Sequence, residues 1–204
     1  LSSQKDDPVI ADDIMDRAWR AVGIALLVIF IYIAIRFRRW QFGLAGLVAL
    51  VHDSLIIFGL FSMFHHVLPF SLEIDQAFIA AILTIVGYSI NDTVIIFDRI
   101  REFSGLHPKR DMRENINAAL NSTLARTLNT SGTTMVVLII IFIFGGEVIR
   151  GFTFALLMGI MIGTYSSLFS ASPVSYDLLG GDRKLKGVPT RMIKQVQKKE
   201  KKKK

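Results

Sequence analysis

Residues 77–97 read AFIAAILTIVGYSINDTVIIF, and this stretch decides the fold class. A helix needs about 20 apolar residues to cross the roughly 30 Å hydrocarbon core of a bilayer, and this stretch has that length and composition. Its one charged residue, Asp92, lies inside the stretch and not at either end. Charged groups are costly inside a membrane and tend to be functional there. We therefore expect a membrane helix that carries a working carboxyl group.

Four further apolar stretches are long enough to cross a membrane. A soluble core could bury one or two such segments, but five in a chain of 204 residues leave too little polar surface to dissolve them. The sequence therefore predicts an all-α membrane protein whose helix bundle occupies 18–176. The expected crossings are 18–37, 41–64, 76–98, 125–147 and 151–175.

The basic residues predict the orientation of the chain in the membrane. The chain has 24 Lys and Arg residues and a net charge of +7, and eleven of the basic residues follow Gly181. Clusters of them also follow the first and third crossings, at 36–39 and 99–113, whereas the lead at 1–17 is acidic. Loops rich in Lys and Arg stay in the cytoplasm. We expect 1–17 to be a periplasmic lead and 177–204 a basic cytoplasmic tail, with a charge that serves orientation and the membrane surface and not nucleic acid.

Residues 109–124 form an amphipathic pattern before the fourth crossing. Met112, Ile116, Ala119 and Leu120 recur at helical spacing, with charged and polar residues between them. Two interpretations remain open. The segment is either a helix that lies along the cytoplasmic face or the extended cytoplasmic start of the fourth crossing.

The sequence predicts neither a metal site nor a cofactor. It has no cysteine, which excludes disulfides, thiolate metal sites and a cysteine nucleophile. The adjacent His65 and His66 fall at the outer end of the second crossing, where we interpret them as interfacial residues. Gly159 and Gly163 have a small-xxx-small spacing that favours close helix packing in the fifth crossing.

Asp92 and Arg126 are the candidates for proton coupling. Asp92 shares one helix face with Tyr88 and Ser89, and a carboxyl group at that depth that gains and loses a proton is what coupling requires. Arg126 lies in a hydroxyl-rich segment at the start of the fourth crossing and is the natural counter-charge. If Arg126 pairs with ionised Asp92, protonation would release the pair. The alternatives are a permanent structural pair for Asp92 and an interfacial, snorkelling arginine for Arg126.

His52 and Asp53 form a second polar pair, in the middle of the second crossing. Asp53 either extends a proton path or acts as a neutral hydrogen-bonding carboxyl group between helices. Further candidates for the proton path or for polar support lie on the third and fourth crossings. They are Tyr88, Ser89, Asn91, Thr127 and Thr130.

Residues 87–102, GYSINDTVIIFDRIRE, closely resemble the signature of the bacterial SecF family, including SecD–SecF fusions. Three further matches occur in the same order as in that family: AWRA at 18–21, VHD at 51–53 and NSTLART at 121–127. The resemblance covers nearly the whole chain.

The resemblance implies an RND-like bundle that works with SecD beside the SecYEG channel and YajC in the bacterial cytoplasmic (inner) membrane. It implies a proton-driven accessory role, not an enzymatic one, late in translocation, with the exported polypeptide engaged on the periplasmic side. Asp92 and Arg126 fall on the positions that the family assigns to proton coupling. Members of the family normally have six crossings and a periplasmic domain after the first, so we expect this chain to be the C-terminal membrane portion.

Three other functions are weighed against this one. An RND-like exporter of small molecules or lipids would use the same charged pair. An intramembrane aspartyl protease would use Asp53 and Asp92 together, but Asp92 lacks the glycine-flanked setting expected of that class. A purely scaffolding subunit would tolerate Asp92→Asn.

Overall fold

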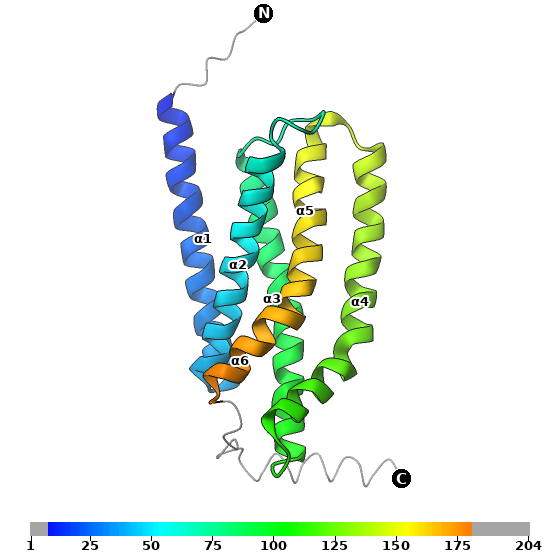
Figure 1. Ribbon diagram of the computed structural model, residues 1–204. Coiled ribbons are helices and arrows are strands. Elements are labelled where there is room, and N and C mark those ends of the chain that lie inside the picture. Colours follow the sequence, from blue (N-terminus) through cyan, green and yellow to red (C-terminus); the bar gives the residue numbers. More distant parts are fainter. Residues whose placement is uncertain (1–7, 181–204) are drawn as a thin grey trace, which may run out of the picture.

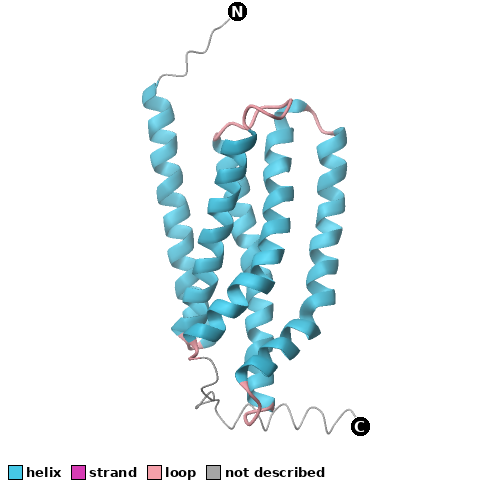
Figure 2. Ribbon diagram, viewed as in Figure 1, coloured by secondary structure: helices cyan, strands magenta, loops and turns pink. Residues whose placement is uncertain are grey.

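The chain forms a bundle of long helices, as the computed structural model in Figure 1 shows. The structure describes residues 8–180, except for the side chains of 8–19 and of Val148. Within that range five helices are long and apolar enough to cross a membrane, and Figure 2 shows helices joined by loops with no strand. The expectation of an all-α membrane bundle with five crossings is confirmed. The basic tail at 181–204 and the first seven residues of the predicted lead lie outside the described residues.

The helices follow one another with short connections, most of which are tight turns. In order they are α1 (Pro8–Phe37), α2 (Trp40–Phe64), α3 (Gln76–Leu106), α4 (Met112–Phe144), α5 (Glu147–Ser166), the π-helix η1 (Ser167–Ala171) and α6 (Ser172–Leu178). Arg38 has a φ of 53° in the turn between α1 and α2.

Two helices extend beyond the crossings expected from the sequence. α1 begins at Pro8, about three turns before the apolar stretch, and so includes part of the segment interpreted as a lead. α3 continues past the expected end at 98 to Leu106, and the following His107 leaves helical geometry immediately before Pro108. A proline disfavours helical geometry in the residue before it, which accounts for the stop. At the other end, Asp75 caps α3 by accepting a hydrogen bond from the backbone N of Phe78 at 2.8 Å.

The amphipathic segment is continuous with the fourth crossing. α4 runs without interruption from Met112 to Phe144, so the structure favours the second interpretation, an extension of the crossing helix. In Figure 1 its first turns slant toward the lower end of α3 before the helix rises. Ser122 and Thr123 donate to the carbonyl oxygen of Ala119, at 2.7 and 3.1 Å. Such bonds to the preceding turn often bend helices.

The fifth crossing is interrupted where the sequence predicted one helix. α5 is followed by η1, whose wider turn immediately precedes Pro173 in α6. A proline inside an α-helix lacks an N–H donor and clashes with the carbonyl group four residues before it. The wider turn relieves this conflict and lets the crossing continue to Leu178.

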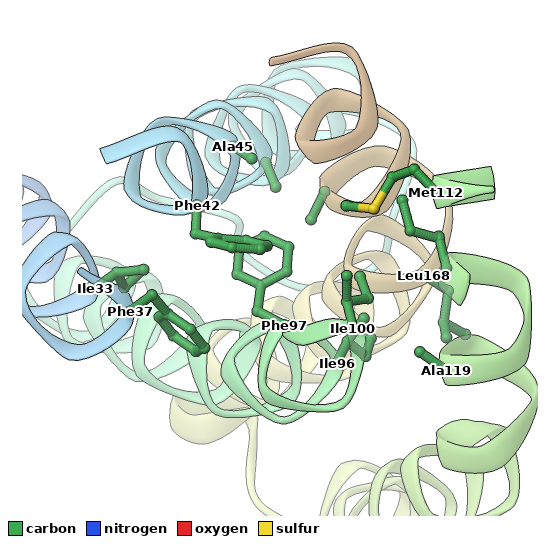
Figure 3. Close-up of a cluster of buried hydrophobic side chains, with 13 residues drawn as sticks. Ile33, Phe37, Phe42, Ala45, Ile96, Phe97, Ile100, Met112, Ala119 and Leu168 are labelled. Atoms are coloured by element: carbon green, nitrogen blue, oxygen red, sulfur yellow. The ribbon is translucent and has the colours of Figure 1, made fainter. Parts of the chain in front are cut away.

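Two apolar clusters fill the bundle, one toward each end. The lower cluster contains Phe37, Phe42 and Phe97, whose rings lie 5.0 to 6.0 Å apart between centroids, and Figure 3 shows them beside Ile33 and Ile100. The upper cluster is built from residues of α2, α3, α4 and α5, among them Phe61, Phe78, Ile82, Ile85 and Ile160.

A layer of buried polar side chains separates the two clusters along α3, α4 and α5. On α3, for example, the upper cluster ends at Val86 and the lower cluster begins at Ile96 among the fully buried residues. The polar layer comprises Asp53, Ser89, Asp92, Thr93, Thr127, Ser131, Thr164, Ser166 and Ser167. Buried polar groups need hydrogen-bond partners, so this layer restricts how the helices can be arranged.

Candidate functional site

Asp92 lies in the polar layer and connects three helices. It is 2 % exposed, and Ser131 of α4 donates a hydrogen bond to its Oδ2 atom at 3.4 Å. Thr164 of α5 donates in turn to the hydroxyl oxygen of Ser131 at 2.6 Å. The carboxyl group of α3 is therefore held by a relay of two hydroxyl groups from α4 and α5.

Asp53 forms a second buried carboxyl site on the α2 side of α3. It is also 2 % exposed, and Ser89 of α3 donates to its Oδ2 atom at 3.0 Å. The Nδ1 atom of His52 lies 3.1 Å from its Oδ1 atom. Ser166 of α5 also faces this carboxyl group, although the Ser166 hydroxyl oxygen has no partner in hydrogen-bond geometry.

A third set of contacts joins the two sites through α5. The hydroxyl groups of Thr93 and Ser167 lie 2.8 Å apart, and Ser167 donates to the backbone oxygen of Ser89 at 3.3 Å. Ser89 and Asp92, which the sequence put on one face of α3, thus belong to different carboxyl sites. The residues 164–167 of α5 contact both.

Arg126 lies near Asp92 without contacting it. The arginine acts electrostatically on the Asp92 carboxyl group, but its side chain is exposed on α4. Among residues 8–180, no ion pair within 4.0 Å joins the two groups. The direct pair considered from the sequence is therefore not formed in this structure.

The other predicted polar residues are dispersed around the two sites. The hydroxyl group of Tyr88 lies 3.2 Å from that of Thr134 on α4. Thr130 is exposed and donates to the Arg126 backbone oxygen at 2.9 Å, and Asn91 is also exposed. Thr127 is buried one turn before Ser131, and its hydroxyl group has no hydrogen-bond partner.

The sequence of residues 2–180 matches the model of a family described as "Protein export membrane protein SecD/SecF, C-terminal". The chain belongs to the SecF family.

Individual relatives agree with this assignment. The protein translocase subunit SecF of Rhodothermus marinus is 58% identical over 171 residues, which cover 84% of this chain and 55% of the relative. The SecF subunit of Cereibacter sphaeroides is 42% identical over 176 residues, which cover 86% of this chain and 52% of the relative. A solved structure, "Crystal structure of SecDF in Super-membrane-facing form", matches with a TM-score of 0.70 and 37% identity over 85% of this chain and 21% of that chain. This SecF-family chain spans about half the length of these curated relatives.

The sequence interpretation of this SecF-family chain missed the contribution of α5. It singled out polar residues on the second, third and fourth crossings, but not Thr164, Ser166 or Ser167. A signal was present, because residues 163–167 read GTYSS within an otherwise apolar stretch. Hydroxyl groups are common enough in membrane helices that this cluster did not stand out beside charged residues.

The two sites are suited to binding protons and not to hydrolysis. Each carboxyl group is buried beside hydroxyl groups, which can donate or accept a hydrogen bond. Asp53 and Asp92 bind different hydroxyl groups, Ser89 and Ser131, and share no hydrogen-bond partner among the described residues. Two carboxyl groups that activate one water molecule would need to face each other.

Proposed function

We propose that this chain is the membrane portion of a SecF subunit that assists late protein export with the proton-motive force, and that Asp92 carries the coupling. The observation that supports this most directly is the burial of Asp92 among hydroxyl groups of three helices with no contacting cation. A carboxyl group in such a site can change its protonation with few steric consequences. It can therefore respond to the proton gradient.

Arg126 is the partner that responds to this change. Its guanidinium group is near enough to act on Asp92 but is not bound to it. An ionised Asp92 attracts the guanidinium group, whereas a neutral Asp92 does not. Each proton would therefore shift the balance between two positions of α4 relative to α3. The energy is sufficient, because one charge that crosses 100 mV releases about 2.3 kcal/mol.

The exposed surface of α3 and α4 supports SecD as the partner. Arg126, Asn129, Thr130 and Thr133 of α4 are exposed inside a candidate membrane span, as is Asn91 of α3. Lipid tails cannot bind these groups, so a polar protein surface is needed to cover them. We propose that SecD covers this surface and that SecYEG and YajC are neighbours of the complex, as the family resemblance implies. A photoreactive residue at Asn129 should form an adduct with SecD. The same probe at Ile24, on α1 at the far side of the bundle in Figure 1, is the control.

The arrangement of charges supports a location in the bacterial cytoplasmic (inner) membrane with the C-terminus inside. The turn after α1, the connection after α3 and the end of α6 all lie at the lower end of the bundle in Figure 1. The first two carry the basic clusters at 36–39 and 99–113. Basic residues near helix ends favour the cytoplasmic side, so we assign the lower end to the cytoplasm. No cofactor other than the proton gradient is needed for the proposed function.

The test uses the full-length protein in cells depleted of SecF. Asp92→Asn should abolish proton-dependent export of a reporter protein while the subunit remains in the membrane at normal levels. Asp98→Asn is the matched control, because Asp98 lies on the same helix but forms a half-exposed ion pair with Arg36 at 3.0 Å. Normal export by the Asp92→Asn protein would contradict the proposal and leave a scaffolding role.

The alternative functions have less support. A small-molecule exporter would need the same charged groups, but the relatives that match this chain are named as protein translocase subunits. An aspartyl protease would need Asp53 and Asp92 to share a water molecule, and α3 instead separates their hydrogen-bond partners.

A further inference from the structure

Asp53 is a buried carboxyl group that the proposed mechanism does not use. It is as buried as Asp92, but neither arginine nor lysine acts on it among the described residues. The one titratable side chain that faces it is His52 of its own helix, and α3 and α5 present only the hydroxyl groups of Ser89 and Ser166. A permanently ionised carboxylate without a fixed counter-charge is costly in such surroundings.

The hydroxyl groups around Asp53 can serve both of its protonation states. An ionised carboxylate only accepts hydrogen bonds, and here Ser89 donates to Oδ2 at 3.0 Å. A neutral carboxyl group gains an O–H donor that needs an acceptor. Ser166 supplies that acceptor, because it faces Asp53, is 0% exposed and has an oxygen atom without a partner. A buried polar atom without a partner calls for an explanation, and a proton-dependent contact is one.

The backbone holds Ser166 close to α3 by two glycine contacts. A Cβ atom added at Gly159 would lie 2.3 Å from the Cδ1 atom of Ile85, and one added at Gly163 would lie 3.1 Å from the Cβ atom of Ser89. These glycines therefore let α5 approach α3 directly before Thr164. The π-helix begins immediately after Ser166. Single π turns occur often at functional sites, where they redirect side chains.

One short segment of α5 consequently contacts both acids. Thr164 bonds to Ser131, which bonds to Asp92, and Ser166 faces Asp53 two residues later. Between them in space, Ser167 holds Thr93 and the backbone of Ser89. A hydroxyl group that reorients at one end of this segment changes the position or hydrogen bonding available at the other.

We propose that Asp53 is a second proton-binding carboxyl group and that residues 164–167 of α5 couple its protonation to that of Asp92. This inference rests on the proposed role of Asp92 in proton coupling. On binding a proton, the Asp53 carboxyl group donates to the Ser166 hydroxyl oxygen, and on losing it accepts from Ser89 alone. Coupling between two binding sites is reciprocal, so each proton must affect the affinity for the other equally.

The experiment is an infrared titration of the full-length protein, reconstituted with its partner subunit. The carbonyl stretch of neutral carboxyl groups is followed as the pH is changed. The bands of Asp53 and Asp92 are assigned by their loss in the Asp53→Asn and Asp92→Asn proteins. We expect both bands to titrate, and each substitution to shift the proton affinity of the other site by the same factor, about 5-fold or more.

Ser166→Ala tests the coupling segment. It should weaken proton binding at Asp53 roughly 3- to 10-fold, the range expected for one lost hydrogen bond, and reduce the reciprocal shift. The control is Ser175→Ala, because Ser175 is equally buried but donates to the Ser172 backbone oxygen of its own helix at 2.7 Å. Thermal unfolding of both proteins checks that they are folded.

The outcomes separate this inference from the proposed function. An Asp53 band that is present or absent at every pH overturns the inference, as does an equal effect of Ser166→Ala and Ser175→Ala. Neither result affects the role of Asp92, which the export assay tests. Conversely, normal export by the Asp92→Asn protein overturns the proposed function, whereas the titration of Asp53 is measured without export.

Discussion

The Asp92 and Asp53 sites are alike in burial and different in charge. Each carboxyl group is 2 % exposed and accepts a hydrogen bond from one serine of a neighbouring helix. Asp92 has a fixed positive charge nearby in Arg126, whereas Asp53 has only His52, a residue whose charge depends on pH. The comparison teaches that burial selects both residues as candidates, and that the neighbouring charge decides what proton release does at each.

The largest expected effect comes from removing the fixed charge. Arg126→Leu should reduce export to the level found without a proton gradient, because ionised Asp92 then has no cation to attract. Arg126→Lys should retain part of the activity, since it keeps the charge but loses the planar guanidinium group. The measurement is reporter export with and without an uncoupler. Arg113→Leu, in the exposed first turn of α4, is the control. Normal export by Arg126→Leu would remove the distinction between the two sites.

A second prediction concerns the packing that both sites share. Gly159→Ala should lower the free energy of unfolding by about 1 to 3 kcal/mol, because the new methyl group overpacks against Ile85. Gly59→Ala is the matched control, since a Cβ atom there meets nothing within 4 Å. Both are measured by denaturation of the purified protein in detergent. Equal stability of the two variants would show that α5 does not depend on its close approach to α3.

A third prediction distinguishes the sites by their hydroxyl groups. Ser131→Ala and Ser89→Ala should each lower the free energy of unfolding by about 1 kcal/mol, through the loss of one hydrogen bond. In an Asp92→Leu background, Ser131→Ala should lose its effect while Ser89→Ala keeps it. Unfolding of the four proteins forms a double-mutant cycle. If both serines lost their effect in that background, the two carboxyl sites would form one unit.

The smallest effect is expected for a bond that belongs to neither site. Tyr88→Phe removes the hydroxyl group that lies 3.2 Å from Thr134. Hydrogen bonds between membrane helices contribute on average about 0.6 kcal/mol, so stability should fall by that amount and export should not change. A marked loss of export would instead add Tyr88 to the machinery of the Asp92 site.

The fold was predictable because membrane helices leave a strong record in sequence. A crossing such as 77–97 needs no tertiary information, since the bilayer itself selects apolar residues over a known length. The ends were less predictable. The continuation of α1 back to Pro8 and of α3 to Leu106 occurs outside the apolar stretches, where local capping and the position of Pro108 decide.

The candidate site was predictable only in its charged members. Asp53 and Asp92 stood out because a carboxyl group inside an apolar stretch is rare. The partners of these acids depend on which helix faces which, and that is a matter of tertiary packing. Ser89 lies next to Asp92 in the helical pattern, yet it binds Asp53 because α2 lies on its side of α3. The π-helix at Ser167–Ala171 was likewise invisible, although Pro173 marked the place where a regular helix could not continue.

The long first helix has a mechanical consequence. Among its described side chains, the fully buried ones are Ile33 and Phe37, both near its lower end. In Figure 1 the upper end of α1 stands apart from the other helices. With a rise of 1.5 Å per residue, the helix from Pro8 to Ile33 forms a lever arm of roughly 40 Å. A small rotation at the turn between α1 and α2 is therefore amplified into a displacement of many ångströms at the opposite face of the membrane.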